Sequence, residues 1–270
     1  MVDAKNPLVE VPPTLNPYAY AASLVRKRLN WDRKLESWRS RKKIRAWQEK
    51  YLGMKAVILC NGPSLLDVDF SMLDETFTFG LNKINLLFDK SRFRPSCIVA
   101  VNPFVIEQNA DFYNATDIPL FLDSRALGLV SAKSTVCFLH STNQTGFARD
   151  CSGSIYQGHT VTYVAMQLAF HMGFQEVALV GCDHTFAAKG HANEVAVAGD
   201  VDNSHFDPNY FAGGVKWHLP DLFESEVAYT RAMNMYHAFG RRIVNSTEGG
   251  ELEVFQRQDL TEFLSGKPTG

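Results

Sequence analysis

The stretch VILCNGPSLLDVDF, residues 57–70, combines a buried strand pattern with a turn suited to binding a ligand. An apolar run at 56–59 predicts a short strand, and the sequence Asn-Gly-Pro-Ser at 61–64 ends it. Glycine lets the backbone approach a ligand closely, proline suits a helix start, and serine can cap that helix. The turn matches neither the Gly-x-Gly-x-x-Gly fingerprint nor a Walker A loop. It therefore predicts a phosphate- or nucleotide-binding turn of another kind.

Apolar runs of strand length recur along the chain and alternate with helical patterns. The strand-like runs lie at 76–81, 97–101, 118–122, 136–139, 177–180 and 243–245. Two helical patterns, at 160–172 and 221–239, are each followed by a glycine. This alternation is typical of βαβ units. We therefore predict an α/β, Rossmann-like, mostly parallel sheet with helices on both faces.

The length and composition favour one large domain with an N-terminal extension. The chain has 270 residues, 46% of them hydrophobic and 21% charged, which is ordinary for a soluble globular protein. We expect an N-terminal arm with basic amphipathic helices at 1–52 and a Rossmann-like nucleotide-binding catalytic domain at 53–265. The net charge of −2 argues against a nucleic-acid partner for the chain as a whole.

The N-terminal extension is strongly basic. Residues 26–50 contain 11 Lys or Arg and 3 Asp or Glu, a local charge of +8. Leu24, Trp31, Leu35 and Trp38 follow helical spacing, which predicts that they share one face. Two interpretations stay open: a solvated helix whose tryptophans pack on the domain, or attachment through residues 20–51 to an anionic membrane face or glycan.

The cysteines and the hydropathy pattern indicate the compartment. The five cysteines form no Cys-x-x-Cys pair, and we expect buried free thiols of a reducing environment. No apolar run reaches the ~18 residues that a bilayer-spanning helix needs, and the N-terminus lacks the apolar region of a signal peptide. We predict a cytoplasmic protein, with peripheral contact at the inner membrane left open.

Several predicted strands end in a small polar residue. Beyond the turn at 61–64, these residues are Asn82, Asn102, Asp183 and Asn245. Ligands of open α/β sheets bind just beyond the carboxyl ends of the strands. Each residue alone can be an ordinary turn former, but together they predict a binding rim.

Three further groups suggest anion, proton or metal chemistry. Gly158, Thr160 and Thr162 precede a helix, where backbone N–H groups favour an anion, although Thr160 can also be an ordinary cap. His218 is a candidate general base or a packing histidine. Any Mg²⁺ or Mn²⁺ ligands would be Asp183, Asp202 and His205, yet their spacing fits no standard zinc pattern. The Asp-x-Asp strings at 67–69 and 200–202 are equally consistent with surface turns.

Several segments resemble a known enzyme family. The stretch at 57–70, FGLNKI at 79–84 and VAVNP at 99–103 resemble the N-terminal half of bacterial lipooligosaccharide sialyltransferases, single Rossmann-like domains that transfer sialic acid from CMP. Residues 160–186 resemble their helix–strand–Gly-x-Asp segment. DNSHF at 202–206, with the later His218, resembles their Asn-Ser-His run and catalytic histidine. The same stretches resemble a family named after archaeal 6-hydroxymethylpterin diphosphokinase, most closely at 205–221 and 249–257. The resemblance covers roughly residues 55–255.

This resemblance implies roles for the rim residues. Asn61, Gly62, Pro63 and Ser64 would line the nucleotide phosphate site. Asn82 and Asn102 would contact the cytidine nucleotide and donor sugar. Thr160 and its neighbours would hold the carboxylate or phosphate of the donor, Asp183 the ribose or base, and His218 would deprotonate the acceptor. Two tyrosines that the sialyltransferases use on the leaving phosphate have no counterpart here, so either His184, Lys189 or a metal would replace them, or the chemistry differs.

Three functions follow as hypotheses. The first is a glycosyltransferase that moves an acidic, sialic-acid-like sugar from a CMP donor to a surface-glycan or lipid-linked acceptor by one inverting displacement. The second is an ATP- and Mg²⁺-dependent pyrophosphoryl transferase acting on a pterin-like alcohol, with Asp67, Asp183 and Asp202 as metal ligands. The third is a non-catalytic nucleotide-binding scaffold. The oligomeric state stays open, a homo-oligomer included.

Overall fold

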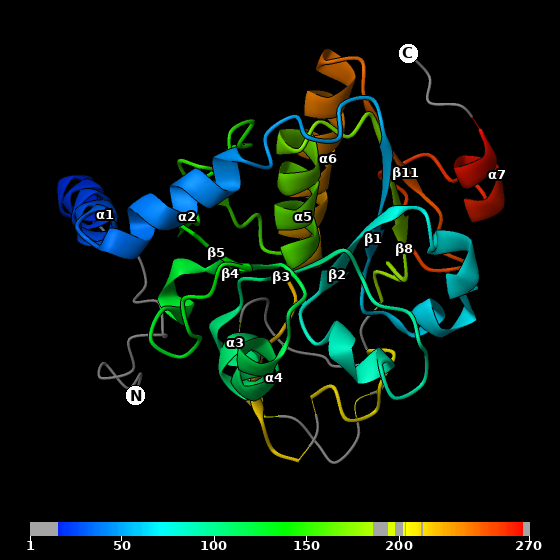
Figure 1. The fold of residues 1–270 in the computed structure, drawn as a ribbon, viewed down its shortest axis with the longest axis horizontal. Helices are drawn as coiled ribbons and strands as arrows, with labels where there is room; N and C mark the ends of the chain where they lie inside the picture. The colour runs from blue at the N-terminus through cyan, green and yellow to red at the C-terminus, as the bar shows by residue number, and fades with distance from the viewer. Residues whose placement is uncertain (1–15, 186–193, 198–201, 203, 212, 267–270) are drawn as a thin grey trace.

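A computed structural model describes residues 16–185, 194–197, 202, 204–211 and 213–266. The centre of the molecule is one seven-stranded parallel sheet (Figure 1). Its strands are β1 (Lys55–Leu59), β2 (Phe77–Leu81), β3 (Cys97–Ala100), β4 (Leu120–Asp123), β5 (Val136–Leu139), β8 (Glu176–Val180) and β11 (Arg242–Asn245). The order across the sheet is β11-β8-β1-β2-β3-β4-β5. Each of these strands overlaps a predicted apolar run, so the predicted fold class is confirmed.

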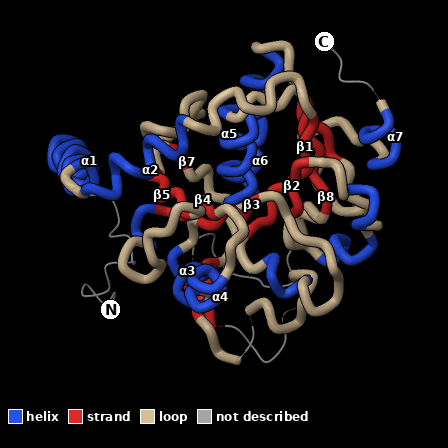
Figure 2. Tube along the Cα trace, in the orientation of Figure 1, coloured by secondary structure: helices blue, strands red, loops and turns tan. Residues whose placement is uncertain are grey.

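Helices cover both faces of the sheet, as Figure 2 shows. They are α1 (Pro17–Asp32), α2 (Leu35–Arg45), α3 (Pro103–Gln108), α4 (Ala110–Ala115), α5 (Val161–His171), α6 (Leu222–Ala238) and α7 (Leu260–Ser265). Short 3-10 turns add η1 (Pro63–Asp67), η2 (Phe70–Leu73), η3 (Ile84–Leu87) and η4 (Ser124–Ala126). Helices α5 and α6 lie on one face, and α3 and α4 on the other (Figure 1). The sequence pattern predicts α5 and α6 but not the short α3, α4 and α7.

Two small sheets are separate from the main one. Strands β6 (Ser141–Thr142) and β7 (Ile155–Tyr156) pair in parallel, and β9 (Val195–Val197) pairs with β10 (Lys216–His218) in antiparallel fashion. The sequence pattern predicts neither, because strands of two or three residues carry too few positions to establish an alternation.

The core has two layers because neighbouring residues of a strand point to opposite faces. In β1, Ala56 and Ile58 belong to the hydrophobic cluster under α5 and α6, whereas Val57 and Leu59 belong to the cluster on the opposite face. All four side chains are fully buried, as expected for a parallel strand covered on both sides. The five cysteines are also buried and free, which confirms that prediction.

Helix α2 covers the edge strand β5 with polar side chains. The backbone N–H of Phe138 donates to Ser40 Oγ at 3.1 Å. The Lys43 ammonium donates to the carbonyls of Lys133 and Val136 at 2.7 and 2.8 Å. These bonds satisfy ladder groups that an edge strand leaves unpaired, and they protect the edge from association.

The prediction that Leu24, Trp31, Leu35 and Trp38 share a face is wrong. Trp31 is buried, but the Trp38 side chain is 65% exposed and Leu35 is exposed as well. The chain leaves the helical conformation at Lys34, whose ψ is 135°, so the periodicity does not continue from α1 to α2. The buried face of α2 is instead built from Glu36, Ser37, Ser40 and Ile44, because the polar edge of β5 needs polar partners.

Candidate functional site

The candidate site lies where the strand order reverses. From β1 the chain proceeds through β2 to β5 on one side, while β8 and β11 lie on the other side. The pairing of β1 with β8 continues past the strand ends, because Cys60 N–H donates to the Val180 carbonyl and Gly62 N–H to the Gly181 carbonyl, both at 2.9 Å. The turns at 61–64 and 181–184 therefore lie side by side at the switch point, where parallel sheets bind ligands.

The carboxylate of Asp183 binds the turn that follows β1. Ser64 donates to Asp183 Oδ2 through its hydroxyl at 2.9 Å and, less closely, through its backbone N–H at 3.4 Å. A Cβ atom at Gly62 would lie 1.8 Å from the same oxygen. Only glycine fits there, because the two turns are in direct contact. The resemblance predicts that Ser64 contacts the nucleotide phosphate. In the structure the Ser64 hydroxyl instead donates to the Asp183 carboxylate.

Two amide side chains at this rim have unused acceptors. Asn61 Oδ1 and Asn82 Oδ1 are buried, and neither has a hydrogen-bond partner among the described residues. Their backbone carbonyls are used: Phe206 N–H donates to that of Asn61 at 2.9 Å, and the Tyr113 hydroxyl to that of Asn82 at 3.0 Å. A buried polar atom without a partner carries a desolvation cost, which a ligand donor would relieve.

The N-terminus of α5 approaches the same rim. Thr160 caps the helix, since its Oγ1 accepts from the Thr162 N–H at 3.3 Å, and Gly158 precedes it with φ of 54°. Thr162 Oγ1 lies 3.7 Å from the sulfur of Cys60, the residue that precedes Asn61. Since α5 has 11 residues, its N-terminal dipole is that of a full helix. The cap interpretation of Thr160 is thus correct, and the helix start lies close enough to β1 to reach a ligand there.

Asn102 and Asn245 have structural partners. Asn102 Oδ1 caps α3 by accepting from the Phe104 N–H at 3.0 Å. The Asn245 amide donates to the Leu252 carbonyl and accepts from the Thr247 N–H. Both residues end strands at the predicted rim, but their side-chain oxygens are occupied by the protein itself.

Of the two predicted catalytic histidines, the structure describes the side chain of His184 but only the backbone of His218. His184 follows Asp183 with φ of 58°, and its Nε2 lies 3.0 Å from a carboxylate oxygen of Glu226 on α6. The backbone of His218 belongs to β10 and pairs with Val195. The side chain of His218, like all of Lys189, lies outside the described part of the chain.

The loop at 202–211 is fixed next to the rim by polar contacts. Asp202 accepts from His205 Nδ1 at 2.8 Å and from the Phe211 N–H at 3.1 Å. Burial alone would raise the pKa of Asp202, but hydrogen bonds, first that from His205, hold it below its ordinary value. Among the described residues, no group of three or more His, Cys, Asp or Glu side chains is placed to hold a metal ion. Asp202 and His205 therefore satisfy one another, and Asp183 binds Ser64.

The sequence argument missed Lys83, which connects this loop to β2. Its ammonium donates to the Tyr210 carbonyl at 2.6 Å and to Gln108 Oε1 at 2.7 Å. Burial lowers the pKa of Lys83 to about 8, and the nearby Asp202 carboxylate opposes that shift. The available signal was a lysine directly after a strand-ending asparagine and directly before the apolar run that starts at Ile84.

The Asp-x-Asp strings have ordinary explanations where they are described. Asp69 caps η2, and its hydrogen bonds from the Ser71 hydroxyl and N–H lower the pKa of the carboxyl. Asp67 lines a groove of about 420 Å³ beside the rim, together with Ser246 and Gln258 at the end of β11. Asp200 lies outside the described residues.

Comparison with protein families shows the family of the chain. A family model described as 6-hydroxymethylpterin diphosphokinase MptE-like matches residues 30–189, more than half of the sequence. The chain belongs to the MptE-like family. The matched range includes the turns at 61–64 and 181–184 that form the candidate site. No curated protein matches the sequence.

Comparison with solved structures gives a relative of this MptE-like fold. The MAf glycosyltransferase from Magnetospirillum magneticum AMB-1 is similar, with a TM-score of 0.50 and 15% sequence identity. The similarity covers 90% of this chain and 42% of the other, so the MptE-like chain spans less than half of that glycosyltransferase. At this identity the likeness shows a shared fold.

Proposed function

We propose that this MptE-like protein is a glycosyltransferase that moves an acidic, sialic-acid-like sugar from a CMP-activated donor to a hydroxyl of a surface-glycan or lipid-linked acceptor. The observation that carries the proposal is the pair of unpartnered amide oxygens, Asn61 Oδ1 and Asn82 Oδ1, which follow the neighbouring strands β1 and β2 at their carboxyl ends. Buried acceptors are the groups that the amine of a base and the hydroxyls of a ribose or sugar can satisfy.

In this proposal Asp183 accepts from the ribose hydroxyls of the nucleotide. The bond from Ser64 Oγ orients the carboxylate, so Ser64 acts on the nucleotide through Asp183 and not as a phosphate ligand. The negative groups of the donor, its carboxylate or phosphate, face the N-terminus of α5 at Thr160–Thr162, where the helix dipole favours an anion. Asn102 contributes mainly through the position of α3.

The reaction is a single displacement at the anomeric carbon. The acceptor oxygen forms a bond to that carbon while the bond from the carbon to the CMP phosphate oxygen breaks, and the phosphate takes the electron pair. His218 receives the acceptor proton as general base. His184, held by Glu226, and the start of α5 stabilise charge on the departing CMP. Inversion of the anomeric configuration is the expected stereochemical result.

Calorimetry of nucleotide binding is the first test. CMP and CMP-sialic acid should bind without added metal, and CMP at 100 times its Kd should raise the free energy of unfolding by about 2.7 kcal/mol. Asp183→Asn should weaken CMP binding, whereas His218→Ala should retain CMP binding and lose release of CMP from the donor. Binding of ATP with Mg²⁺ but not of CMP would contradict the proposal.

A second candidate activity is favoured by the family description itself. A 6-hydroxymethylpterin diphosphokinase-like enzyme would transfer the terminal diphosphoryl group of ATP to an alcohol and release AMP, with Mg²⁺ held by Asp67, Asp183 and Asp202. Within the described residues these three carboxylates do not form a common metal-binding group. AMP that appears only when ATP, Mg²⁺ and a pterin alcohol are all present would support this activity. Nucleotide binding without turnover of either donor would indicate the non-catalytic scaffold.

A further inference from the structure

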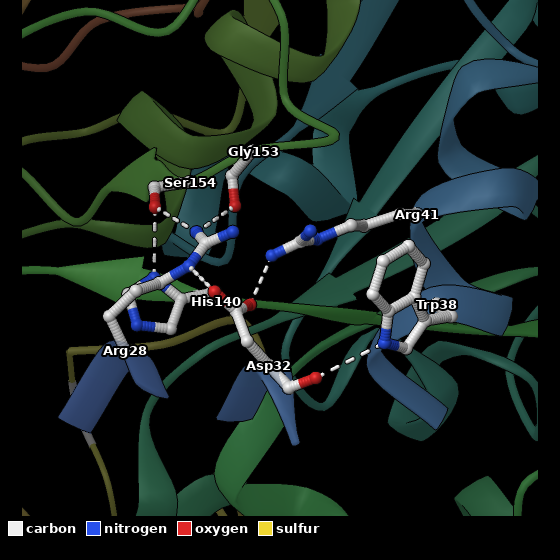
Figure 3. Close-up of polar contacts among 7 residues, drawn as sticks. All are labelled: Arg28, Asp32, Trp38, Arg41, His140, Gly153 and Ser154. Carbon is white, nitrogen blue, oxygen red and sulfur yellow. Dashed lines mark hydrogen bonds and ion pairs between the residues drawn. The ribbon is translucent and has the colours of Figure 1, made fainter. Parts of the chain in front are cut away.

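The N-terminal helices α1 and α2 are held rigidly against the domain. Figure 3 shows Asp32 between two arginines, bonded to Arg28 Nε at 2.8 Å and to Arg41. Arg28 also donates to the Gly153 carbonyl at 2.6 Å and to Ser154 Oγ at 2.8 Å, in the segment before β7. The orientation of α1 is therefore set by the fold and not by a free linker.

The acids of this segment are used internally, whereas its cations face solvent. Asp32 is paired as described, and Glu36 is buried with Lys43 Nζ at 3.5 Å from its carboxylate. Glu49 is the one exposed acid between residues 26 and 50. Five exposed cations have side chains without a partner among the described residues: Arg26, Lys27, Arg33, Lys34 and Lys42. The exposed charged side chains of residues 26–50 are thus nearly all positive.

Large apolar side chains are exposed among these cations. On α1, Tyr18, Val25 and Leu29 follow one another at spacings of seven and four residues, so they share a stripe that points away from the buried Trp31. On α2, Leu35 and Trp38 are neighbours three residues apart and are both about two-thirds exposed. Within the described residues, none of the five packs into either hydrophobic core cluster.

The Trp38 ring is fixed in this exposed position. Its Nε1–H donates to the Asp32 carbonyl at 3.2 Å, and the Arg41 guanidinium lies 5.9 Å from the ring centroid. Figure 3 shows the ring beside Arg41, at the corner between the two helices. An exposed indole held by a hydrogen bond is preorganised for contact, because it loses little side-chain entropy on binding.

We propose that α1 and α2 form a docking surface for an anionic lipid bilayer. We call it the helical patch: the apolar side chains of Val25, Leu29, Leu35 and Trp38 with the five unpaired cations. Cations attract anionic headgroups, and apolar and indole side chains enter the boundary between headgroups and acyl chains. The remaining sequence carries a net charge near −10 against +8 for residues 26–50. An anionic bilayer therefore attracts the helical patch and repels the rest of the protein, and this orients the protein on the bilayer.

Lipid is favoured over a soluble polyanion by the apolar component. A polyanionic glycan or nucleic acid needs the cations but gains little from the exposed apolar side chains on the two helices. On the described residues, no helix is both long and apolar enough to cross a bilayer, so the contact would be peripheral. The proposal does not depend on the function proposed for the rim.

The test is sedimentation of the full chain with vesicles. Binding should occur with vesicles of phosphatidylcholine mixed with phosphatidylglycerol, and not with phosphatidylcholine alone. The triple variant Arg26→Gln/Lys27→Gln/Arg33→Gln should bind about 100-fold more weakly, since each cation near an anionic surface contributes about fivefold. The matched variant Arg92→Gln/Arg149→Gln/Lys216→Gln removes exposed cations elsewhere and should bind like the unmodified protein.

Fluorescence distinguishes insertion from charge attraction. Trp31 and Trp217 are buried, and Trp47 is partly buried and packed against the hydrophobic core. A blue shift of emission on vesicle binding should therefore come from Trp38 and be absent in Trp38→Phe. Equal sedimentation with both lipid compositions would overturn the proposal, as would unweakened binding of the triple variant. So would unshifted Trp38 emission together with equally tight binding to soluble heparin, which would assign the patch to a polyanion. Unchanged CMP affinity in the triple variant keeps this test separate from that of the rim.

Discussion

The rim at the switch point and the edge at β5 differ in which of their buried polar groups have hydrogen-bond partners. At the edge, Ser40 and Lys43 of α2 bond to backbone groups around β5. At the rim, the side-chain oxygens of Asn61 and Asn82 have no partner among the described residues. Each unsatisfied buried group costs about 1–3 kcal/mol, and among the described residues the edge still leaves one on α2, the Ser37 hydroxyl. The two unpartnered oxygens of the rim differ from Ser37 in their place, since both follow strands of the main sheet at their carboxyl ends.

Gly62→Ala should have the largest effect, because it disrupts the contact on which the rim depends. The new methyl group would lie 1.8 Å from Asp183 Oδ2 and 2.8 Å from the Gly181 carbonyl oxygen. We expect the free energy of unfolding to fall by about 2–3 kcal/mol and CMP binding to be lost, measured by urea unfolding and calorimetry. Gly153→Ala is the control, since its methyl group meets no atom within 4 Å. Normal CMP binding by Gly62→Ala would show that the ligand lies elsewhere.

Two serines of α2 sharpen the comparison within the edge itself. Ser40→Ala should lower the free energy of unfolding by about 1–2 kcal/mol, because it leaves the Phe138 N–H without its acceptor. Ser37 is equally buried but its hydroxyl has no partner among the described residues. Ser37→Ala should therefore be neutral or slightly stabilising. Chemical denaturation of the two variants tests the contrast, and equal losses of stability would refute it.

Asn61→Ala and Asn102→Ala compare two strand-ending asparagines. Asn61→Ala should change the free energy of unfolding by less than about 0.5 kcal/mol while it weakens CMP binding roughly tenfold, because its oxygen is reserved for the ligand. Asn102→Ala should cost about 1 kcal/mol of stability, since it removes the cap of α3. Strong destabilisation by Asn61→Ala would mean that its side chain has a structural role.

At neutral pH the titration of Lys83 has the smallest effect on the free energy of unfolding, because it begins only above the pKa of the folded protein. The pKa of Lys83 is about 8 in the folded protein, against the ordinary lysine value of 10.5 that applies to the unfolded chain. Between these values the unfolded chain holds more protons, so this lysine makes the free energy of unfolding rise with pH over that window. Lys83→Met should remove this rise while it lowers stability at every pH through loss of the bonds to Tyr210 and Gln108. Parallel pH profiles of both proteins in urea unfolding would contradict the assignment.

The strands were predictable because each is a short apolar run that ends in a turn residue. A strand buried on both faces is apolar at nearly every position. β3 is apolar throughout, and β1 and β8 are apolar after a charged first residue, Lys55 and Glu176. Asn61, Gly62 and Ser64 could be placed in the turn that follows β1 for the same local reason. Helix α2 was misread because apolar spacing was carried across Lys34, where the helix is interrupted. Its polar buried face depends on β5, about 100 residues away.

The sequence by itself determined where the strands and the main helices lie, and that strand-ending polar residues share one edge, because these features follow from local periodicity and from parallel pairing. Only the tertiary structure decided the strand order, and with it the contact of Ser64 with Asp183, which are 119 residues apart. It also decided which amide oxygens stay unpartnered: Asn61 and Asn102 follow similar strands, yet one is free and the other caps a helix. Such differences depend on neighbours that only long-range packing brings together.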